Sequence, residues 1–200
     1  MKTEELIAAL AADPNINRPL TGMRMALGGL LSVVLLLGFW HLRADFPQVL
    51  SKPLVLAKFV LPLSVVLVAW RLKSRPYGLL LLWPLWLPVL AAAGLFLLTM
   101  PDEGLAAAIL GSSWRTCLAS IPFLALPIGV GAFVALRRIV VTAPERDGLI
   151  AGLTAGAFAA AIYALHCNED APAFYTVWYS AGILICGIVG RYTGRHVLGV

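Results

Sequence analysis

Charged residues are scarce in this chain of 200 residues: Asp, Glu, Lys and Arg together make up 12% of it. A typical soluble domain carries about 25% charged residues. The mean hydropathy is +0.90, and 60% of the residues are hydrophobic. So little polar side-chain material excludes an ordinary soluble globular protein. The composition instead predicts a protein that lies within a lipid bilayer.

The apolar runs also lack the strict apolar–polar alternation of a transmembrane β-barrel. With a barrel excluded, segments that cross the bilayer must be helices, because backbone amides find no water there. A helix needs about 20 apolar residues to cross the hydrocarbon core. We therefore predict an all-α integral membrane protein with a bundle of six transmembrane helices. The predicted segments are 22–40, 54–70, 79–98, 118–136, 148–165 and 174–190.

The first apolar run is not a cleavable signal peptide, because no small-residue cleavage site opens a polar domain behind it. Residues 1–13 before it form the one segment that resembles soluble structure. They combine a good N-cap, an acidic first turn and an apolar stripe at helical spacing. These residues are Thr3, Glu4, Glu5, Leu6, Ile7 and Leu10.

A helix this short is marginal by itself in water. It suits docking into a groove on a cytoplasmic partner, and the alternative is a helix that lies on the membrane surface. The sequence thus divides into residues 1–21, a cytoplasmic binding segment with its tether, and residues 22–200, the transmembrane domain.

Lys and Arg are distributed unequally between the two sides of the predicted bundle. Eleven of the fifteen fall on the side that carries both termini, which the positive-inside rule assigns to the cytoplasm. The pI near 9.4 therefore needs no nucleic acid to explain it. We expect a multi-pass membrane protein with both termini in the cytoplasm.

Cysteine is scarce too, with three in the chain and no C-x-x-C motif of the kind expected in a disulfide-forming membrane enzyme. Cys117 directly precedes the fourth predicted span, and Cys167 follows the fifth. Consecutive spans run antiparallel, so both cysteines are expected at the outer end, facing the same water. The pair suits a sensor that forms a disulfide, binds a soft metal ion or reports an oxidant. A structural disulfide and two unrelated cysteines remain the alternatives.

Several side chains near these cysteines are candidate metal or redox neighbours, because imidazole and carboxylate groups complete soft metal sites. They are Trp114, His166, Glu169 and Asp170. No resident cofactor is expected, and a heavy-metal ion would act as a signal.

The centres of the predicted spans lack ionisable residues except Lys58, which we expect to extend outward to the interface. This absence argues against an ion-coupled transporter. An intramembrane serine protease needs a buried histidine, and the three histidines all fall at predicted helix ends. A small transporter or channel and a membrane thiol oxidoreductase remain the alternative functions.

Small residues recur every four positions in the last two spans, a spacing that lets helices approach closely. The stripes are Gly148, Gly152, Gly156, Ala160 and Ala164, followed by Gly182, Cys186, Gly190 and Gly194. Cys186 is therefore expected to be an inert packing residue.

The chain resembles the NrsF family in its layout and in four segments: TEELIAALAAD, the RPL tether at 18–20, WRTCLASIP and LHCNEDAPAFYTVWY. This family comprises small six-span membrane-bound anti-sigma factors. The resemblance implies that the N-terminal segment sequesters an extracytoplasmic-function sigma factor. It also implies that Cys117 and Cys167 sense oxidative or heavy-metal stress. A non-enzymatic regulator is therefore predicted.

Overall fold

The computed structural model describes residues 18–46, 51–74, 90, 94, 97, 104–139 and 141–199. Every regular element in these ranges is a helix, which confirms the all-α class for this part of the chain. The helices are α2 (Arg18–Phe39), α3 (Pro53–Ser74), α5 (Leu105–Leu110), α6 (Trp114–Leu136), α7 (Pro144–Tyr163) and α8 (Pro172–Val197). The predicted binding residues Glu4, Glu5, Leu6, Ile7 and Leu10 lie outside the described residues.

Three helical stretches are long and apolar enough to cross a membrane, where the sequence predicts six spans. They are Gly22–Phe39, Ala106–Leu136 and Pro172–Val197. The apolar part of α3, Val55–Trp70, is shorter. Helix α7 has three charged residues in its first turn, Glu145, Arg146 and Asp147, and is not among these stretches. The predicted span 79–98 falls almost entirely outside the described residues.

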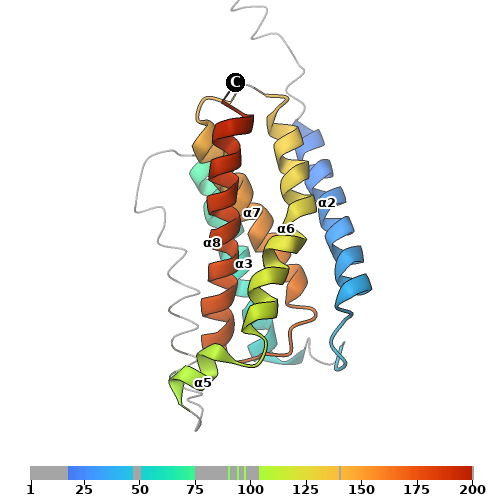
Figure 1. Ribbon diagram of the computed structural model, residues 1–200, viewed down its shortest axis with the longest axis vertical. Helices are drawn as coiled ribbons and strands as arrows, with labels where there is room; N and C mark the ends of the chain where they lie inside the picture. The colour runs from blue at the N-terminus through green and yellow to red at the C-terminus, as the bar shows by residue number, and fades with distance from the viewer. Residues whose placement is uncertain are drawn as a thin grey trace, which may run out of the picture.

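The long helices run side by side along the length of the molecule, and the short α5 crosses one end (Figure 1). Helix α7 is central, because it packs against α8, α6, α3 and α2. We call the end where α8 finishes the C-terminal end, and the other the cysteine end. Helices α2 and α7 begin at the C-terminal end, while α6 and α8 begin at the cysteine end (Figure 1).

Local sequence explains where these helices begin and end. Helices α7 and α8 both have proline in their first turn, where the missing N–H costs no hydrogen bond. Glu145 and Asp147 in the first turn of α7 complement the positive end of the helix dipole. Helix α2 ends at Phe39, and His41 two residues later has a left-handed φ of 62°. The Trp40 and His41 amides both donate to the Leu36 carbonyl there.

Helices α7 and α8 approach along the two small-residue stripes. A Cβ added to Gly152 would overlap the Cys186 carbonyl oxygen, and one added to Gly148 would overlap that of Gly190. Cys186 therefore lies in a helix seam, as its spacing predicts. Gly182 does not take part, because its open side faces Ile121 of α6. One stripe on α8 thus serves two neighbouring helices.

Gly152→Ala is expected to destabilise the folded protein, because the methyl group would press against backbone and not against a movable side chain. Overpacking of this kind costs about 1–3 kcal/mol. The matched control is Gly29→Ala in α2, where nothing lies within 4 Å of the added carbon. Removing a mid-helix glycine there should leave stability unchanged or raise it. Thermal unfolding in detergent measures both, and equal midpoints for the two variants would contradict the close α7–α8 packing.

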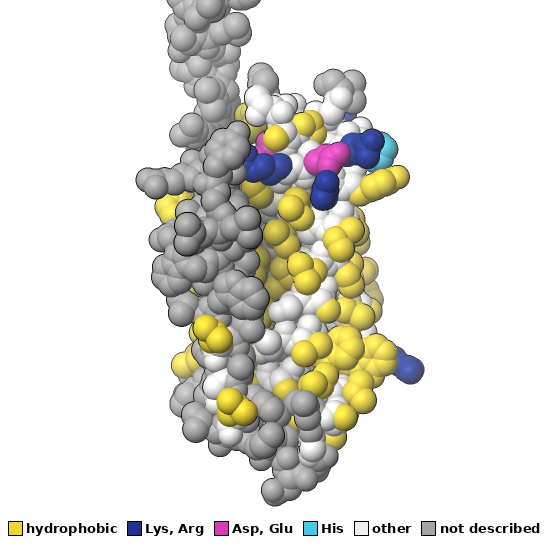
Figure 2. Space-filling model, turned by 90° about the vertical axis from the view of Figure 1, so that its left-hand side faces the viewer, with side chains coloured by type: hydrophobic (Ala, Val, Ile, Leu, Met, Phe, Trp, Pro, Cys, Tyr) yellow, Lys and Arg dark blue, Asp and Glu magenta, His cyan; other side chains and the backbone are white. Residues whose placement is uncertain are grey.

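The outer surface of the bundle is apolar in its middle. On the side of the molecule in Figure 2, hydrophobic side chains cover the central part and charged ones gather towards the C-terminal end. Helix α2 shows the same character: Leu27, Leu30 and Val34 are 60%, 62% and 56% exposed. Exposed apolar area of this extent suits a lipid environment and not water.

Candidate functional site

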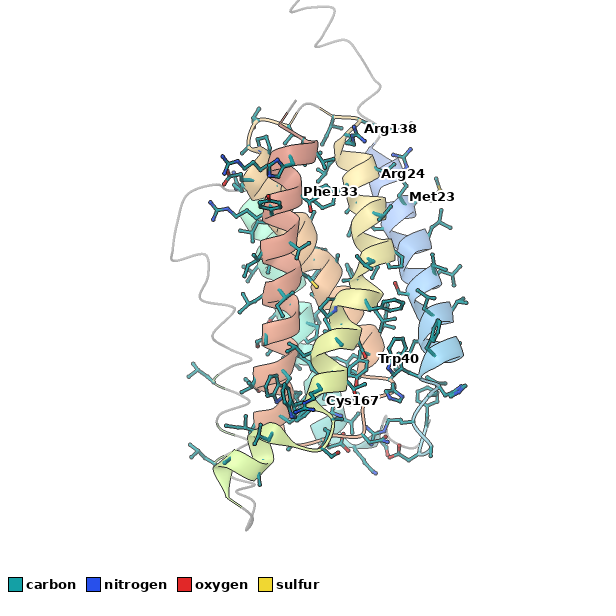
Figure 3. All side chains as sticks on the ribbon, in the orientation of Figure 1. Met23, Arg24, Trp40, Phe133, Arg138 and Cys167 are labelled. Carbon is teal, nitrogen blue, oxygen red and sulfur yellow. The ribbon has the colours of Figure 1, made fainter. Side chains whose placement is uncertain are left out.

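Cys117 and Cys167 lie at the same end of the bundle, at the start of α6 and in the loop after α7 (Figure 3). Their relative exposures are 0% and 2%. Both belong to one cluster of packed buried residues, together with Tyr163, Tyr175 and Tyr179. All three cysteines of the chain are free thiols. The sequence correctly places the pair at one end, but the expectation that they face water is wrong.

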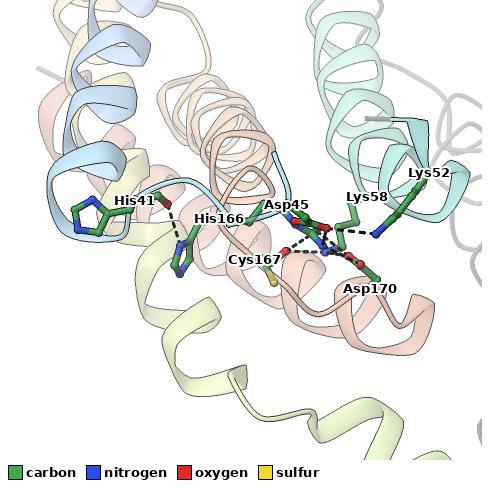
Figure 4. Close-up of polar contacts among 8 residues, drawn as sticks. His41, Asp45, Lys52, Lys58, His166, Cys167 and Asp170 are labelled. Carbon is green, nitrogen blue, oxygen red and sulfur yellow. Dashed lines mark hydrogen bonds and ion pairs between the residues drawn. The ribbon is translucent and has the colours of Figure 1, made fainter. Parts of the chain in front are cut away.

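Five charged side chains form an ion cluster beside Cys167 (Figure 4), which we call the Asp170 cluster; they are Arg43, Asp45, Lys52, Lys58 and Asp170. Arg43 lies in the loop after α2, Lys58 in α3 and Asp170 in the loop between α7 and α8. The Lys58 ammonium lies 2.6 Å from Asp170 Oδ1. The Arg43 guanidinium donates to both carboxylate oxygens of Asp170, at 3.0 and 3.1 Å. A single carboxylate therefore joins three separate segments.

The same two cations also hold the backbone of Cys167. Arg43 Nη1 donates to the Cys167 carbonyl oxygen at 3.1 Å, and Lys58 Nζ donates to it at 2.9 Å. The Cys167 carbonyl faces the cations while the sulfur points away from them (Figure 4). The ion cluster therefore fixes the position of the cysteine through its backbone.

Two further contacts join the loop after α2 to the Cys167 loop. The Arg43 amide donates to the Leu165 carbonyl at 3.2 Å. His166 Nδ1 lies 3.0 Å from the His41 carbonyl oxygen. The left-handed conformation of His41 turns the chain so that both contacts form. The end of α2 is thus attached firmly to the segment that carries Cys167.

The charges of this cluster stabilise each other. Burial alone would raise the pKa of Asp170, but the hydrogen bonds from Arg43 and Lys58 outweigh it and hold that pKa below its usual value. The hydrogen bond from Arg43 likewise lowers the pKa of Asp45. Both carboxylates therefore stay ionised at neutral pH, as two buried cations require.

Lys58 does not extend to the interface as the sequence predicts. Its exposure is 0%, and Arg43 is only 6% exposed. Burying a lysine in this way is costly unless it is paired and hydrogen-bonded, and Asp170 with the Cys167 carbonyl supplies both. The correction follows from tertiary structure, because these partners lie more than 100 residues away in the sequence.

The other candidate neighbours of the cysteines are engaged elsewhere. Glu169 Oε1 accepts hydrogen bonds from the Ser112 amide and hydroxyl, at 2.8 and 2.6 Å. Trp114 stacks on Trp178, with ring centroids 5.0 Å apart. No group of three His, Cys, Asp or Glu residues that could hold a metal ion occurs in the described part of the chain. The predicted soft-metal site, made of both cysteine sulfurs with His166 and either Glu169 or Asp170, is therefore not assembled in these residues.

The sequence contained one signal for the Asp170 cluster that our prediction did not use. Lys58 is the single charge well inside a predicted span, and an ionisable residue there usually marks a functional site with a nearby partner. Arg43 and Asp170 gave no such signal, because both fall in short polar loops where exposed charges are ordinary.

The described residues define an all-helical protein with three helices apolar enough to cross a membrane and a pair of buried thiols under an ion cluster. The sequence model of the NrsF family, negative regulator of sigma F, matches residues 8–199. The chain therefore belongs to the NrsF family and is an anti-sigma factor, a regulatory role that points away from catalysis.

Two curated relatives match over nearly their full length. The chain is 35% identical to the anti-sigma-F factor NrsF of Caulobacter vibrioides over 213 aligned residues, which cover 99% of each protein. It is 34% identical to the probable anti-sigma-F factor NrsF of Azospira oryzae, again with 99% of each chain covered. No solved structure matches this chain.

Proposed function

We propose that this protein holds an extracytoplasmic-function sigma factor at the inner membrane and releases it under oxidative or heavy-metal stress. The sequence similarity to anti-sigma-F factors over nearly the full length supports the binding of a sigma factor. The sigma factor bound would be of the sigma F kind that those relatives are named for. The N-terminal segment with Leu6, Ile7 and Leu10 would bind it on the cytoplasmic side.

The burial of two free thiols in one cluster supports the release of the sigma factor under stress. In the resting state the thiols would be reduced and covered. A peroxide would oxidise both: one S–S bond forms, the O–O bond breaks, and the two thiol protons leave in two molecules of water. A thiophilic metal ion would instead bind both sulfurs as thiolates and displace two protons.

The Asp170 cluster supplies a route from the cysteines to the binding segment. It attaches the Cys167 loop to the residues that follow α2. Helix α2 then runs along the bundle from the cysteine end to the C-terminal end, where it begins at Arg18 (Figure 1). Movement of the Cys167 loop would therefore shift α2 and the tether. With six spans and both termini in the cytoplasm, the cysteines would react on the outer side of the membrane. The sigma factor would be bound and released on the cytoplasmic side.

Co-purification tests the central claim. The full chain would be produced with a candidate sigma factor, extracted in detergent and captured by an affinity tag on its C-terminus. We expect the sigma factor to remain bound after washing and to dissociate after peroxide or a thiophilic metal is added. The proposal would be contradicted if the purified membrane protein bound none of the sigma factors that its own organism encodes.

Cys117→Ser and Cys167→Ser should each weaken the response of a sigma-dependent reporter to oxidant or metal. Each single change should be about as damaging as the double, because a two-thiol device fails when either partner is lost. Cys186→Ser is the matched control, since Cys186 is also buried but lies in the α7–α8 seam. Protein abundance is measured alongside by immunoblot. A normal response at normal abundance in both variants would show that these thiols are not the sensor.

A further inference from the structure

An apolar groove lies between α6 and α8, with α7 as its floor. Its volume is about 450 Å³, within the range of ligand sites in proteins. Val130 and Phe133 of α6 line one wall and Val189 of α8 the other; Figure 3 shows Phe133 between the two helices. Val130 and Val189 are 62% and 56% exposed, so the groove opens towards the surroundings of the bundle.

The groove exists because small residues line its floor and walls. Gly129 of α6 and Ala155 of α7 leave space that larger side chains would fill. A Cβ on Gly129 would meet only the Ala155 Cβ, at 3.9 Å, so the space above it is open. An apolar groove that opens to the hydrocarbon core of a bilayer would be filled by an apolar chain, because no water is present there.

Polar groups occur at one end of the groove. Arg137, directly after α6, lines it at the C-terminal end of the bundle, together with Thr193 of α8. The Arg137 guanidinium makes no hydrogen bond or ion pair with any of the residues that the structure describes. The groove thus offers an apolar slot that ends at an exposed arginine.

We propose that this groove binds an anionic phospholipid, with one acyl chain against α6 and α8 and the phosphate on Arg137. The groove is apolar along the bundle and cationic at its end. This order matches the apolar acyl chain and the anionic phosphate of a phospholipid in its leaflet. Charge complementarity favours this occupant over the chain itself. Residues 77–100 contain no Asp or Glu, so the predicted span 79–98 offers no carboxylate that could neutralise Arg137.

Native mass spectrometry of the full chain in detergent tests the proposal, with phosphatidylglycerol and phosphatidylcholine of identical acyl chains as probes. The wild type should retain phosphatidylglycerol in preference to phosphatidylcholine. Arg137→Gln should reduce that preference about five-fold, the effect of one arginine at an anionic surface. Arg138→Gln is the matched control, because Arg138 is adjacent and exposed but does not line the groove.

Gly129→Leu should fill the groove and remove binding of both lipids. Val130→Trp tests the same point at an exposed position, if the glycine variant fails to fold. Equal lipid retention by Arg137→Gln and Arg138→Gln would overturn the phosphate site. Retention of lipid by a groove-filling variant that stays monodisperse would overturn the acyl-chain slot. A crosslink that places residues 79–98 or a second copy in the groove would overturn both.

Discussion

Asp170→Asn is expected to destabilise the protein by about 3 kcal/mol, because it leaves two buried cations without their shared carboxylate. Lys58 is fully buried and has no other carboxylate partner in the described residues, whereas Arg43 keeps Asp45. Partial exposure of Asp170 puts the loss at the low end of the range for broken buried pairs. Thermal unfolding of the purified protein in detergent measures the change.

Two further variants test whether the destabilisation by Asp170→Asn is specific to the buried cluster or would follow from the loss of an exposed ion pair as well. Glu145→Gln removes the partner of Arg191 at the C-terminal end, where both side chains are exposed. That change should leave the midpoint near the wild-type value. Combining Asp170→Asn with Lys58→Met removes both charges and should recover part of the stability. No difference between the Asp170 and Glu145 variants would show that the cluster contributes nothing.

The same cluster predicts a dependence on pH. The folded state holds the pKa of Asp170 below its usual value, so its contribution is complete above the unfolded pKa of about 3.9. It is lost as the pH falls through the lower, folded-state pKa. The wild-type melting temperature should therefore fall steeply below about pH 4, and the Asp170→Asn variant should fall less over the same range.

Leu10→Asp should release the sigma factor in unstressed cells. A buried leucine contributes roughly 1.5–3 kcal/mol, so its loss weakens binding about ten- to hundredfold, and an added charge weakens it further. Ala12→Asp is the matched control, because it adds the same charge on the opposite face of the predicted helix. A sigma-dependent reporter and co-purification measure both variants.

Membrane accumulation should be the same for both variants, since the change lies before the first predicted span. Full repression by Leu10→Asp would place the sigma-binding surface elsewhere, in the polar segments 71–75 or 137–147 at the C-terminal end.

Much of the architecture could be predicted from the amino-acid sequence. Scarcity of charge and long apolar runs determine a protein that prefers lipid. They also determine that it is helical, because a backbone amide without a hydrogen-bond partner is costly inside a bilayer. The position of Cys117 and Cys167 at one end follows from antiparallel neighbours alone. The close α7–α8 seam follows from glycines at every fourth position. These conclusions depend on periodicity and composition, which the sequence carries locally.

Tertiary structure alone decided which side chains meet. Asp170 pairs with Arg43 and Lys58, and Glu169 with Ser112, across 57 to 127 residues of sequence. The thiols are buried because they pack in one cluster with tyrosines of α7 and α8. Gly182 faces α6 because α8 packs on two helices at once. No local pattern encodes such pairings, since each depends on the relative position and rotation of helices that are distant in sequence.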